Sequence, residues 1–234
     1  MSDDILFEKR GHAGFVTLNR PKALNALTYG MVKELARQLT EWASDDAVCH
    51  VVICAAGEKA FCAGGDIISL YEAGKSGETD QTGFFFDEYR LNAQIKSYPK
   101  PYIALIDGIV MGGGVGVSVH GSHRVGTENT MFAMPETGIG FFPDVGGTYF
   151  LPRMPKSTGV YCALSAGRLK QADALETGVI THASTRAELA SLMTALEEST
   201  DVDATLERFQ AQSGASSLME KADLIDAIFS AGSV

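Results

Sequence analysis

The feature that most constrains the fold is a unit that occurs twice, in which a short apolar segment leads to a glycine-rich turn. Val51-Val52-Ile53-Cys54 precedes Ala63-Gly64-Gly65-Asp66, and the segment 101–106 precedes Gly112-Gly113-Gly114. Short apolar runs bounded by turn residues predict buried strands. A further strand is predicted over 13–19. The order strand, helix, strand and glycine turn predicts an α/β fold with ligand-binding groups at strand ends.

Helical patterns lie between and after these strands. Thr28 has the character of an N-cap, and a stripe of apolar residues follows it at helical spacing: Met31, Leu35, Leu39 and Trp42. Segment 73–83 is rich in Gly, Ser, Thr and charge, which predicts a mobile loop. Helices are also predicted over 115–120 and, after residue 167, over three segments: 186–196, 203–212 and 220–229.

Composition excludes several classes of function. The formal net charge of −10 argues against a nucleic-acid partner. The apolar runs are shorter than 18 residues and the N-terminus has no apolar core, so we expect a soluble, cytoplasmic protein with no membrane partner. The four cysteines have no CxxC spacing, which indicates reduced thiols. His120 and His123 lack a third ligand at suitable spacing, so no metal site is predicted.

The glycine turns suggest a site that binds a carbonyl oxygen. Glycine lets the backbone approach a ligand and direct N–H groups at it. Two such turns, offering Gly65 and Gly113, would supply two donors to one developing oxyanion. The alternative is that each turn only permits tight packing between a strand and a helix.

Four acids are candidates for chemistry. Glu136 and Asp144 each follow a proline in an apolar setting. Desolvation there would raise the pKa of the carboxyl group and suit it to act as a general base or nucleophile. The alternative for Glu136 is a role as an N-cap or as a partner in an ion pair. Asp66 is placed to cap a helix that begins near Ile67. Glu88 falls on a predicted helix, where a solvated surface charge is the default interpretation.

These segments together resemble the crotonase (enoyl-CoA hydratase/isomerase) superfamily, over about residues 14–181. Within it they look like the branch that hydrolyses short branched β-hydroxyacyl-CoA thioesters, such as 3-hydroxyisobutyryl-CoA in valine catabolism. The resemblance implies a spiral of ββα turns with two stacked sheets, followed by helices. The matching segments are 19–27, 61–67, 108–121 and 132–153.

The resemblance also implies roles for individual residues. The N–H groups of Gly65 and Gly113 would form the oxyanion hole, and Glu136 would attack the thioester or activate water. Asp144 would orient the acyl hydroxyl or assist proton transfer, with Glu88 close by. Coenzyme A, as part of the substrate and with no further cofactor, would lie along residues from two segments: Lys22, Leu24 and Ala26, then Ala63, Gly65, Asp66 and Ile67.

One position separates the hydrolase branch from the hydratases that it resembles. Hydratases in the superfamily carry a glutamate at the position of Gly116, in addition to the one at Glu136. A chain with glycine there lacks one of the two carboxylates that add water across a double bond. A hydrolase is therefore favoured over an enoyl-CoA hydratase or isomerase, and a non-catalytic acyl-CoA binding fragment is the third alternative.

The C-terminal region departs from the pattern of the hydrolases, which are substantially longer. We expect a crotonase-like core over 1–183 and an incomplete helical region over 184–234, as in a truncated chain. A homo-oligomer is predicted where these helices allow one.

Overall fold

The structure is a computed structural model that describes residues 3–76 and 81–231. Two sheets organise it, one of six strands in the order β1-β2-β3-β5-β7-β10 and one of four in the order β4-β6-β8-β9. The strands are β1 (Ile5–Arg10), β2 (Ala13–Leu18), β3 (His50–Ala55), β4 (Ala60–Cys62), β5 (Tyr102–Ile106), β6 (Ile109–Met111), β7 (His123–Gly126), β8 (Met131–Ala133), β9 (Leu169–Lys170) and β10 (His182–Ala183).

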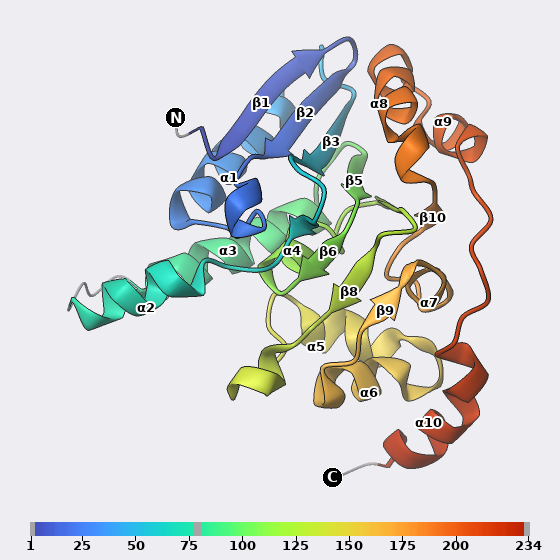
Figure 1. Cartoon of the computed structure of the whole chain (residues 1–234). Coiled ribbons are helices and arrows are strands. Elements are labelled where there is room, and N and C mark those ends of the chain that lie inside the picture. Colours follow the sequence, from blue (N-terminus) through green and yellow to red (C-terminus); the bar gives the residue numbers. More distant parts are fainter. Residues whose placement is uncertain (1–2, 77–80, 232–234) are drawn as a thin grey trace.

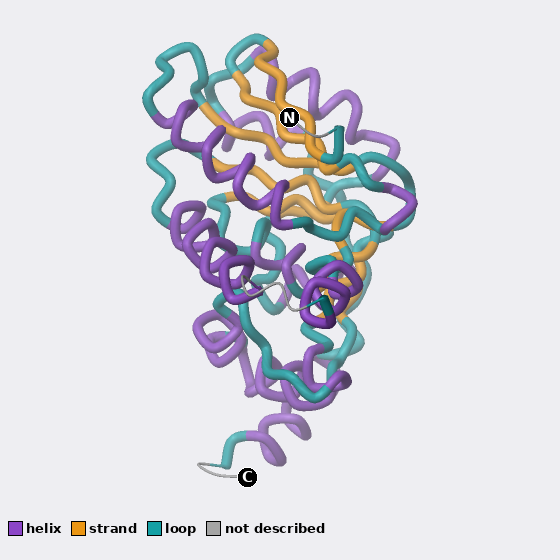
Figure 2. Tube along the Cα trace, turned by 90° about the vertical axis from the view of Figure 1, so that its left-hand side faces the viewer, coloured by secondary structure: helices purple, strands orange, loops and turns teal. Residues whose placement is uncertain are grey.

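Helices surround the strands and extend beyond them at the C-terminal end (Figure 2). The α-helices are α1 (Tyr29–Ala43), α2 (Ile67–Lys75), α3 (Gln81–Lys96), α4 (Gly113–Gly116), α5 (Gly147–Phe150), α6 (Thr158–Ser165), α7 (Gln171–Glu176), α8 (Leu189–Glu198), α9 (Val202–Arg208) and α10 (Ala222–Phe229). The 3-10 helices are η1 (Pro21–Ala23), η2 (Glu136–Ile139), η3 (Leu151–Arg153), η4 (Pro155–Ser157), η5 (Arg186–Glu188) and η6 (Met219–Lys221).

Three successive pairs of strands alternate between the sheets. β3, β5 and β7 enter the large sheet, and the strand that follows each of them, β4, β6 or β8, enters the small one. All pairings are parallel except β1 with β2 and β8 with β9. This arrangement confirms the predicted α/β fold with two sheets. Because β4, β6 and β8 are parallel neighbours, the segments that follow them emerge at one edge of the small sheet (Figure 1).

The large sheet is buried on both faces, as parallel sheets usually are. Val16 and Ile53 point into the larger core cluster, together with the buried stripe of α1. Phe15 and Val52, their neighbours in sequence, point to the opposite face because strand side chains alternate. There they pack with apolar residues of α8 and α9, which Figure 1 shows beside β3 and β5.

Several sequence predictions hold at the level of single elements. The strand predicted over 13–19 is β2, and the two apolar segments before the glycine turns are β3 and β5. Thr28 caps α1 by accepting a hydrogen bond from Met31 N–H at 3.2 Å. The four residues of the predicted stripe, from Met31 to Trp42, are all buried.

Other element boundaries were wrong. The loop predicted over 73–83 is helical at both ends, since α2 continues to Lys75 and α3 begins at Gln81; residues 77–80 lie outside the described residues. The helix predicted over 115–120 is instead the single turn α4, which begins at Gly113. Just after α4 ends, Tyr102 Oη of β5 donates a hydrogen bond to Val117 O at 2.9 Å, which holds this part of the chain against β5.

Of the three helices predicted after residue 167, those over 186–196 and 220–229 are present, the first as η5 and α8, and only the one predicted over 203–212 ends early. α9 ends at Arg208, and the segment predicted as a helix over 220–229 is a turn of η6 followed by α10. No helix in residues 3–76 or 81–231 is long and apolar enough to cross a membrane.

Truncation of the α1 stripe tests the larger core. Leu39→Ala removes a side chain that is fully buried beneath the large sheet, and it is expected to lower the free energy of unfolding by roughly 2–5 kcal/mol. The matched control is Leu224→Ala, the same truncation at a position of α10 that is 63% exposed, for which a change within about 0.5 kcal/mol is expected. Urea unfolding followed by circular dichroism measures both. Equal effects of the two substitutions would contradict this assignment of the core.

Candidate active site

Two backbone segments lie against each other at the entrance to the site. Leu27 N–H donates to Gly64 O and Asp66 N–H donates to Leu27 O, both at 2.8 Å. Ala63 N–H donates to Leu24 O at 3.0 Å. The segments 22–27 and 63–66 are therefore joined as a short two-stranded ribbon. It contains most of the two stretches, 22–26 and 63–67, that the resemblance predicted to hold coenzyme A.

Arg20 and Asn25 fix this ribbon. The Arg20 guanidinium donates to Ala26 O at 2.6 Å and to Asp66 Oδ2 at 2.9 Å. Asn25 is buried in the left-handed region (φ 56°) and donates to the carbonyls of Ala56 and Ala60. Sequence reasoning gave neither residue a role. Asn is one of the few side chains that adopts this conformation readily, so an Asn just after a Pro-containing turn was the available signal.

Asp66 has the capping role that was predicted for it. Its carboxylate accepts a hydrogen bond from Ser69 N–H at 3.1 Å at the start of α2. Partial burial opposes ionisation, but the hydrogen bonds from Ser69 and Arg20 outweigh it and hold the pKa of Asp66 below its ordinary value. The residue is thus a carboxylate that secures a turn.

The glycine turns place two unpaired donors next to each other. Within the described part of the chain, no group accepts a hydrogen bond from the N–H of Gly65 or of Gly113. A Cβ added to Gly113 would lie 3.2 Å from Gly65 N and 2.6 Å from Glu88 Oε1, so a side chain there would occupy the space between the donors and the acid. The sequence requires glycine at this position because the donors and the acid converge there.

A cavity of about 380 Å³ lies in front of these donors. Its walls come from the ends of β4, β6 and β8, from α3 and from the segment 139–144. The predicted site residues that line it are Ala63, Gly65, Ile67, Glu88, Gly113, Glu136 and Asp144. The structure therefore brings together the residues predicted for catalysis and three of those predicted for coenzyme A.

The remaining predicted coenzyme A residues lie outside the cavity wall. Leu24, Ala26 and Asp66 belong to the paired segments, and Lys22 is exposed on η1. Lys22 has no ion pair among the residues that the structure describes, and its ammonium is open to solvent.

Glu88 is buried, so the default interpretation of a solvated surface charge was wrong. Only 2% of its surface is exposed, and its Oε1 has no hydrogen-bond partner among the described residues. Burial, reinforced by the charge of Asp144, raises the pKa of Glu88 to about 8. The helix was predicted correctly but the face was not, because α3 turns this side of the helix to the cavity.

Glu136 occupies the setting that was predicted for it, just after Pro135 at the end of β8. It is 7% exposed, and its Oε2 also lacks a partner within the described residues. Burial raises the pKa of Glu136 to about 7, with a further contribution from Asp144. A Cβ on Gly112 would lie 3.2 Å from Glu136 Oε1, so this carboxyl group approaches the glycine turn closely.

Asp144 completes the group of acids and has a partner that the sequence did not reveal. Tyr89 Oη donates to Asp144 Oδ2 at 2.8 Å. Burial raises the pKa of Asp144 and the bond from Tyr89 opposes that change. The pKa of Tyr89 is raised by burial and by the same carboxylate, so the phenol stays protonated and donates. Tyr89 and Glu88 are adjacent in α3, but they were not linked to Asp144 by any sequence spacing.

The histidines and cysteines take separate positions. His120 Nε2 lies 2.7 Å from Val145 O, and His123 Nε2 pairs with Asp203 on another face. No group of three or more possible metal ligands is found among residues 3–76 and 81–231. All four cysteines are free, and burial raises the pKa of Cys62, next to the site, to about 12.

Solved structures with the same fold carry related names. A carnitinyl-CoA dehydratase from Mycobacterium thermoresistibile is 45% identical with a TM-score of 0.95, and the match covers 100% of this chain and 68% of that one. An enoyl-CoA hydratase from Rhodobacter sphaeroides is 40% identical with a TM-score of 0.91, covering 98% and 67% of the two chains.

Curated relatives carry the name of the hydrolase branch. The protein named 3-hydroxyisobutyryl-CoA hydrolase, mitochondrial, from Danio rerio is 52% identical, and the match covers 99% of this chain and 63% of the relative. The human protein of the same name is 52% identical over 77% of this chain and 47% of its own length. The chain thus spans about half to two thirds of the length of these relatives. Their names place them in mitochondria, which contradicts the predicted cytoplasmic location.

The predicted resemblance is confirmed over nearly the whole chain. The family model described as enoyl-CoA hydratase/isomerase matches residues 13–234. Its span includes both glycine turns, the three acids of the cavity and every described helix. The chain belongs to the enoyl-CoA hydratase/isomerase family.

Proposed function

We propose that this chain carries the active site of a thioester hydrolase that acts on short branched β-hydroxyacyl-CoA, with 3-hydroxyisobutyryl-CoA as substrate. One observation carries the proposal: the N–H groups of Gly65 and Gly113, which have no partner among the described residues, and the carboxyl group of Glu136 line the same cavity. The names of the curated relatives support the choice of acyl group.

The two N–H groups would bind the thioester oxygen. Donors fixed in a water-excluded site stabilise the negative charge that develops on that oxygen when the carbonyl carbon is attacked. Because both donors belong to the backbone, the chain does not reorganise as the charge forms. Removing one such donor in a known enzyme costs about 10²–10³-fold in kcat, which sets the scale of their expected contribution.

Glu136 would supply the nucleophile in one of two ways. As a general base, it takes a proton from water while the water oxygen attacks the carbonyl carbon. As a nucleophile, its carboxylate oxygen attacks to form a mixed anhydride, which water then hydrolyses. In both routes the carbon–sulfur bond breaks, the thiolate of coenzyme A leaves and takes up a proton, and the acid is released. The Glu136 pKa of about 7 suits proton transfer at neutral pH.

The other two acids would act on the acyl group. Asp144, held by Tyr89, would orient the acyl hydroxyl or assist proton transfer. Glu88, whose pKa is about 8, would be mainly protonated at pH 7 and present a neutral carboxyl group next to the oxyanion donors. A neutral Glu88 avoids placing a second negative charge where the oxyanion forms.

Coenzyme A would lie along the ribbon of residues 22–27 and 63–66, with the exposed Lys22 ammonium available to a phosphate. The chemistry requires only water and these side chains, so we propose no cofactor beyond the coenzyme A of the substrate. The proposal also includes assembly of the chain into a homo-oligomer. It divides the chain into a core over 1–183 and a helical region over 184–234.

Hydration of an enoyl-CoA is a second candidate, because the two solved structures are named as a dehydratase and a hydratase. Packing around Gly116 weighs against it. A Cβ at this position would lie 2.8 Å from Asn92 Nδ2 and 2.9 Å from Val145 Cβ, which leaves no room for a second catalytic glutamate. A non-catalytic acyl-CoA binding fragment is the third candidate, because the chain spans 63% or less of the curated relatives.

Thiol release from 3-hydroxyisobutyryl-CoA tests the proposed function directly. We expect the chain to release coenzyme A, and Glu136→Gln to lower kcat by about 10²–10⁴-fold because the proton acceptor or nucleophile is lost. Glu207→Gln, on the exposed surface of α9, is the matched control and should leave kcat unchanged. Hydration of crotonyl-CoA in place of thiol release would show a hydratase. Binding of the substrate without turnover would show a binding fragment.

The pH dependence of kcat/KM tests the assigned protonation states. Glu136 must be ionised to act, so we expect activity to fall by about tenfold per pH unit below its pKa of about 7. Ionisation of Glu88 adds a negative charge beside the oxyanion donors, so activity should also fall above about pH 8.

Glu88→Gln separates the two limbs of this profile, because glutamine is neutral at every pH and similar in size. The decline at high pH should disappear in this variant, and the decline at low pH should stay. Rates are corrected for spontaneous thioester hydrolysis at each pH. A high-pH decline that persists in Glu88→Gln would rule out this role for Glu88.

Substitution at Gly116 tests the distinction from hydratases. Gly116→Glu is expected to destabilise the chain and give no crotonyl-CoA hydration, since the new Cβ would collide with Asn92 and Val145. The control is Gly214→Glu, in the loop before α10, at a position where an added Cβ meets nothing within 4 Å. Thermal unfolding measures stability, and loss of absorbance by crotonyl-CoA measures hydration. A folded Gly116→Glu protein with hydratase activity would show that this space is open.

A further inference from the structure

The turn that carries Asp144 is strained. Val145, the next residue, has φ of 43°, in the left-handed region, and Gly146 follows with φ of 86°. Glycine adopts such angles freely, but for a β-branched residue they are rare and cost free energy. The turn of residues 143–147, which we call the Asp144 turn, therefore has to be held by contacts from neighbouring elements.

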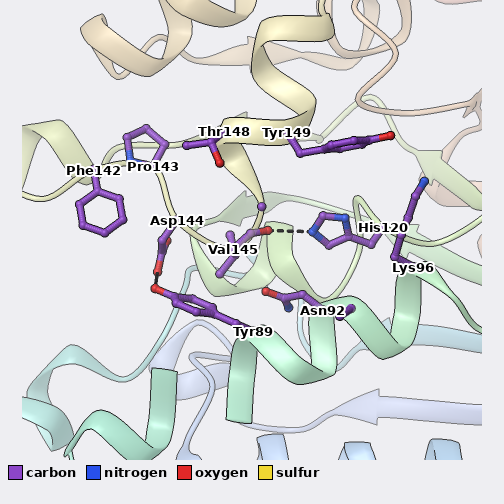
Figure 3. A pocket seen from close by; sticks show the side chains of 12 residues that line it. Tyr89, Asn92, Lys96, His120, Phe142, Pro143, Asp144, Val145, Thr148 and Tyr149 are labelled. Carbon is purple, nitrogen blue, oxygen red and sulfur yellow. Dashed lines mark hydrogen bonds between the residues drawn. The ribbon is translucent and has the colours of Figure 1, made fainter. Parts of the chain in front are cut away.

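His120 makes one of these contacts. Its Nε2 lies 2.7 Å from Val145 O, and Figure 3 shows the imidazole directed at this carbonyl group. A carbonyl oxygen only accepts hydrogen bonds, so the ring must donate through Nε2–H. Burial lowers the pKa of His120, which keeps the ring neutral. The bond holds the carbonyl of the residue whose backbone is strained.

The imidazole also packs against the turn. A Cβ on Gly146 would lie 2.6 Å from His120 Cε1, so the ring occupies the space that a side chain would need. On another side, His120 and Phe150 of α5 meet edge to face, with ring centroids 6.4 Å apart. The ring thus connects the turn that follows α4 to the Asp144 turn and to Phe150 of α5.

Further contacts of the turn come from α3. The Val145 side chain is 2% exposed and lies beside Asn92, at the position facing Gly116. Tyr89 holds the carboxylate of Asp144. Figure 3 shows both arrangements along one cavity of about 580 Å³, with Tyr89 and Asn92 below the turn and His120 beside it. The turn is therefore held at the Asp144 carboxylate, at the Val145 side chain and at the Val145 carbonyl.

We infer that His120 is a positioning residue for Asp144. His120 holds the strained Val145 carbonyl and thereby fixes where the Asp144 carboxyl group lies in the cavity that also holds Glu136. The inference rests on the proposed function, in which Asp144 acts on the acyl group. An alternative is that His120 only fills space between α4 and α5. The two differ in whether the hydrogen bond, rather than the ring, is needed for turnover.

The decisive comparison is between His120→Phe and His120→Gln, with thiol release from 3-hydroxyisobutyryl-CoA as the readout. Phe keeps an aromatic ring, slightly larger than imidazole, but has no donor, and we expect it to lower kcat by about 10–100-fold with KM changed by less than about threefold. Gln places an amide N–H near the position of Nε2 and should restore kcat to within about threefold of the original. His123→Phe, which removes the histidine paired with Asp203, is the matched control and should leave kcat unchanged.

A double-mutant cycle with Val145→Gly tests the part played by strain. Glycine adopts the left-handed conformation without cost, so the turn should need the His120 bond less. His120→Phe should therefore lower kcat by a smaller factor in the Val145→Gly background than in the original one. The same four proteins are unfolded in urea, where His120→Phe should lower the midpoint less in the Val145→Gly background.

The outcomes separate this inference from the proposed function. An unchanged kcat in His120→Phe, an equal loss in the Phe and Gln variants, or an equal loss in both Val145 backgrounds would overturn it. If the original chain releases no thiol, the proposed function fails, and the urea cycle alone decides whether His120 holds the strained turn. Absence of coupling in that cycle would then overturn the inference as well.

Discussion

The parallel pairing of β4, β6 and β8 is the constraint on which the rest of the site depends. Each strand is only three residues long. Each is followed within three residues by a segment that carries a candidate catalytic group: the turn at Gly65, the turn at Gly113 and the acid Glu136. Parallel strands end at the same edge, so pairing alone brings these three segments together, although the first and the last of them, at Gly65 and Glu136, are 71 residues apart in the chain. The larger sheet and its two cores serve to keep this short sheet in place.

Sequence reasoning succeeded where a local rule decides the structure. Thr28 and Asp66 cap the helices predicted for them, and the strands before the glycine turns are present. Local patterns failed where burial depends on distant elements, and only the family resemblance set Glu88 close to Asp144. Glu88 has the local context of a surface helix, and only its packing against the turn at Gly113 makes it a buried acid. Its pairing with the Asp144 region, through the neighbouring Tyr89, spans 55 residues and has no local signal.

The three acids of the cavity make the folded chain less stable than it would otherwise be. Glu88 and Glu136 each keep a buried carboxylate oxygen with no partner among the described residues, and all three acids have raised pKa values. A buried polar atom without a partner costs roughly 1–3 kcal/mol, more if it is charged. A scaffold gains nothing from such groups, whereas a site that binds a polar acyl group and water would satisfy them when occupied. The N–H groups of Gly65 and Gly113, which also lack partners among the described residues, would be satisfied in the same way by a bound carbonyl oxygen.

Backbone conformation, more than the choice of acid, separates the possible reactions of this site. Gly113 and Gly116 lie where a side chain would collide with Glu88 and with Asn92 and Val145, respectively. Val145 packs at Gly116 with its backbone in the left-handed conformation, while its carbonyl meets His120 and the neighbouring Asp144 lines the cavity. One strained residue thus lies against Gly116, the position that separates the two candidate reactions, and is the direct neighbour of Asp144. A change from one reaction to the other would therefore require the turn, its histidine and the glycine opposite it to change together.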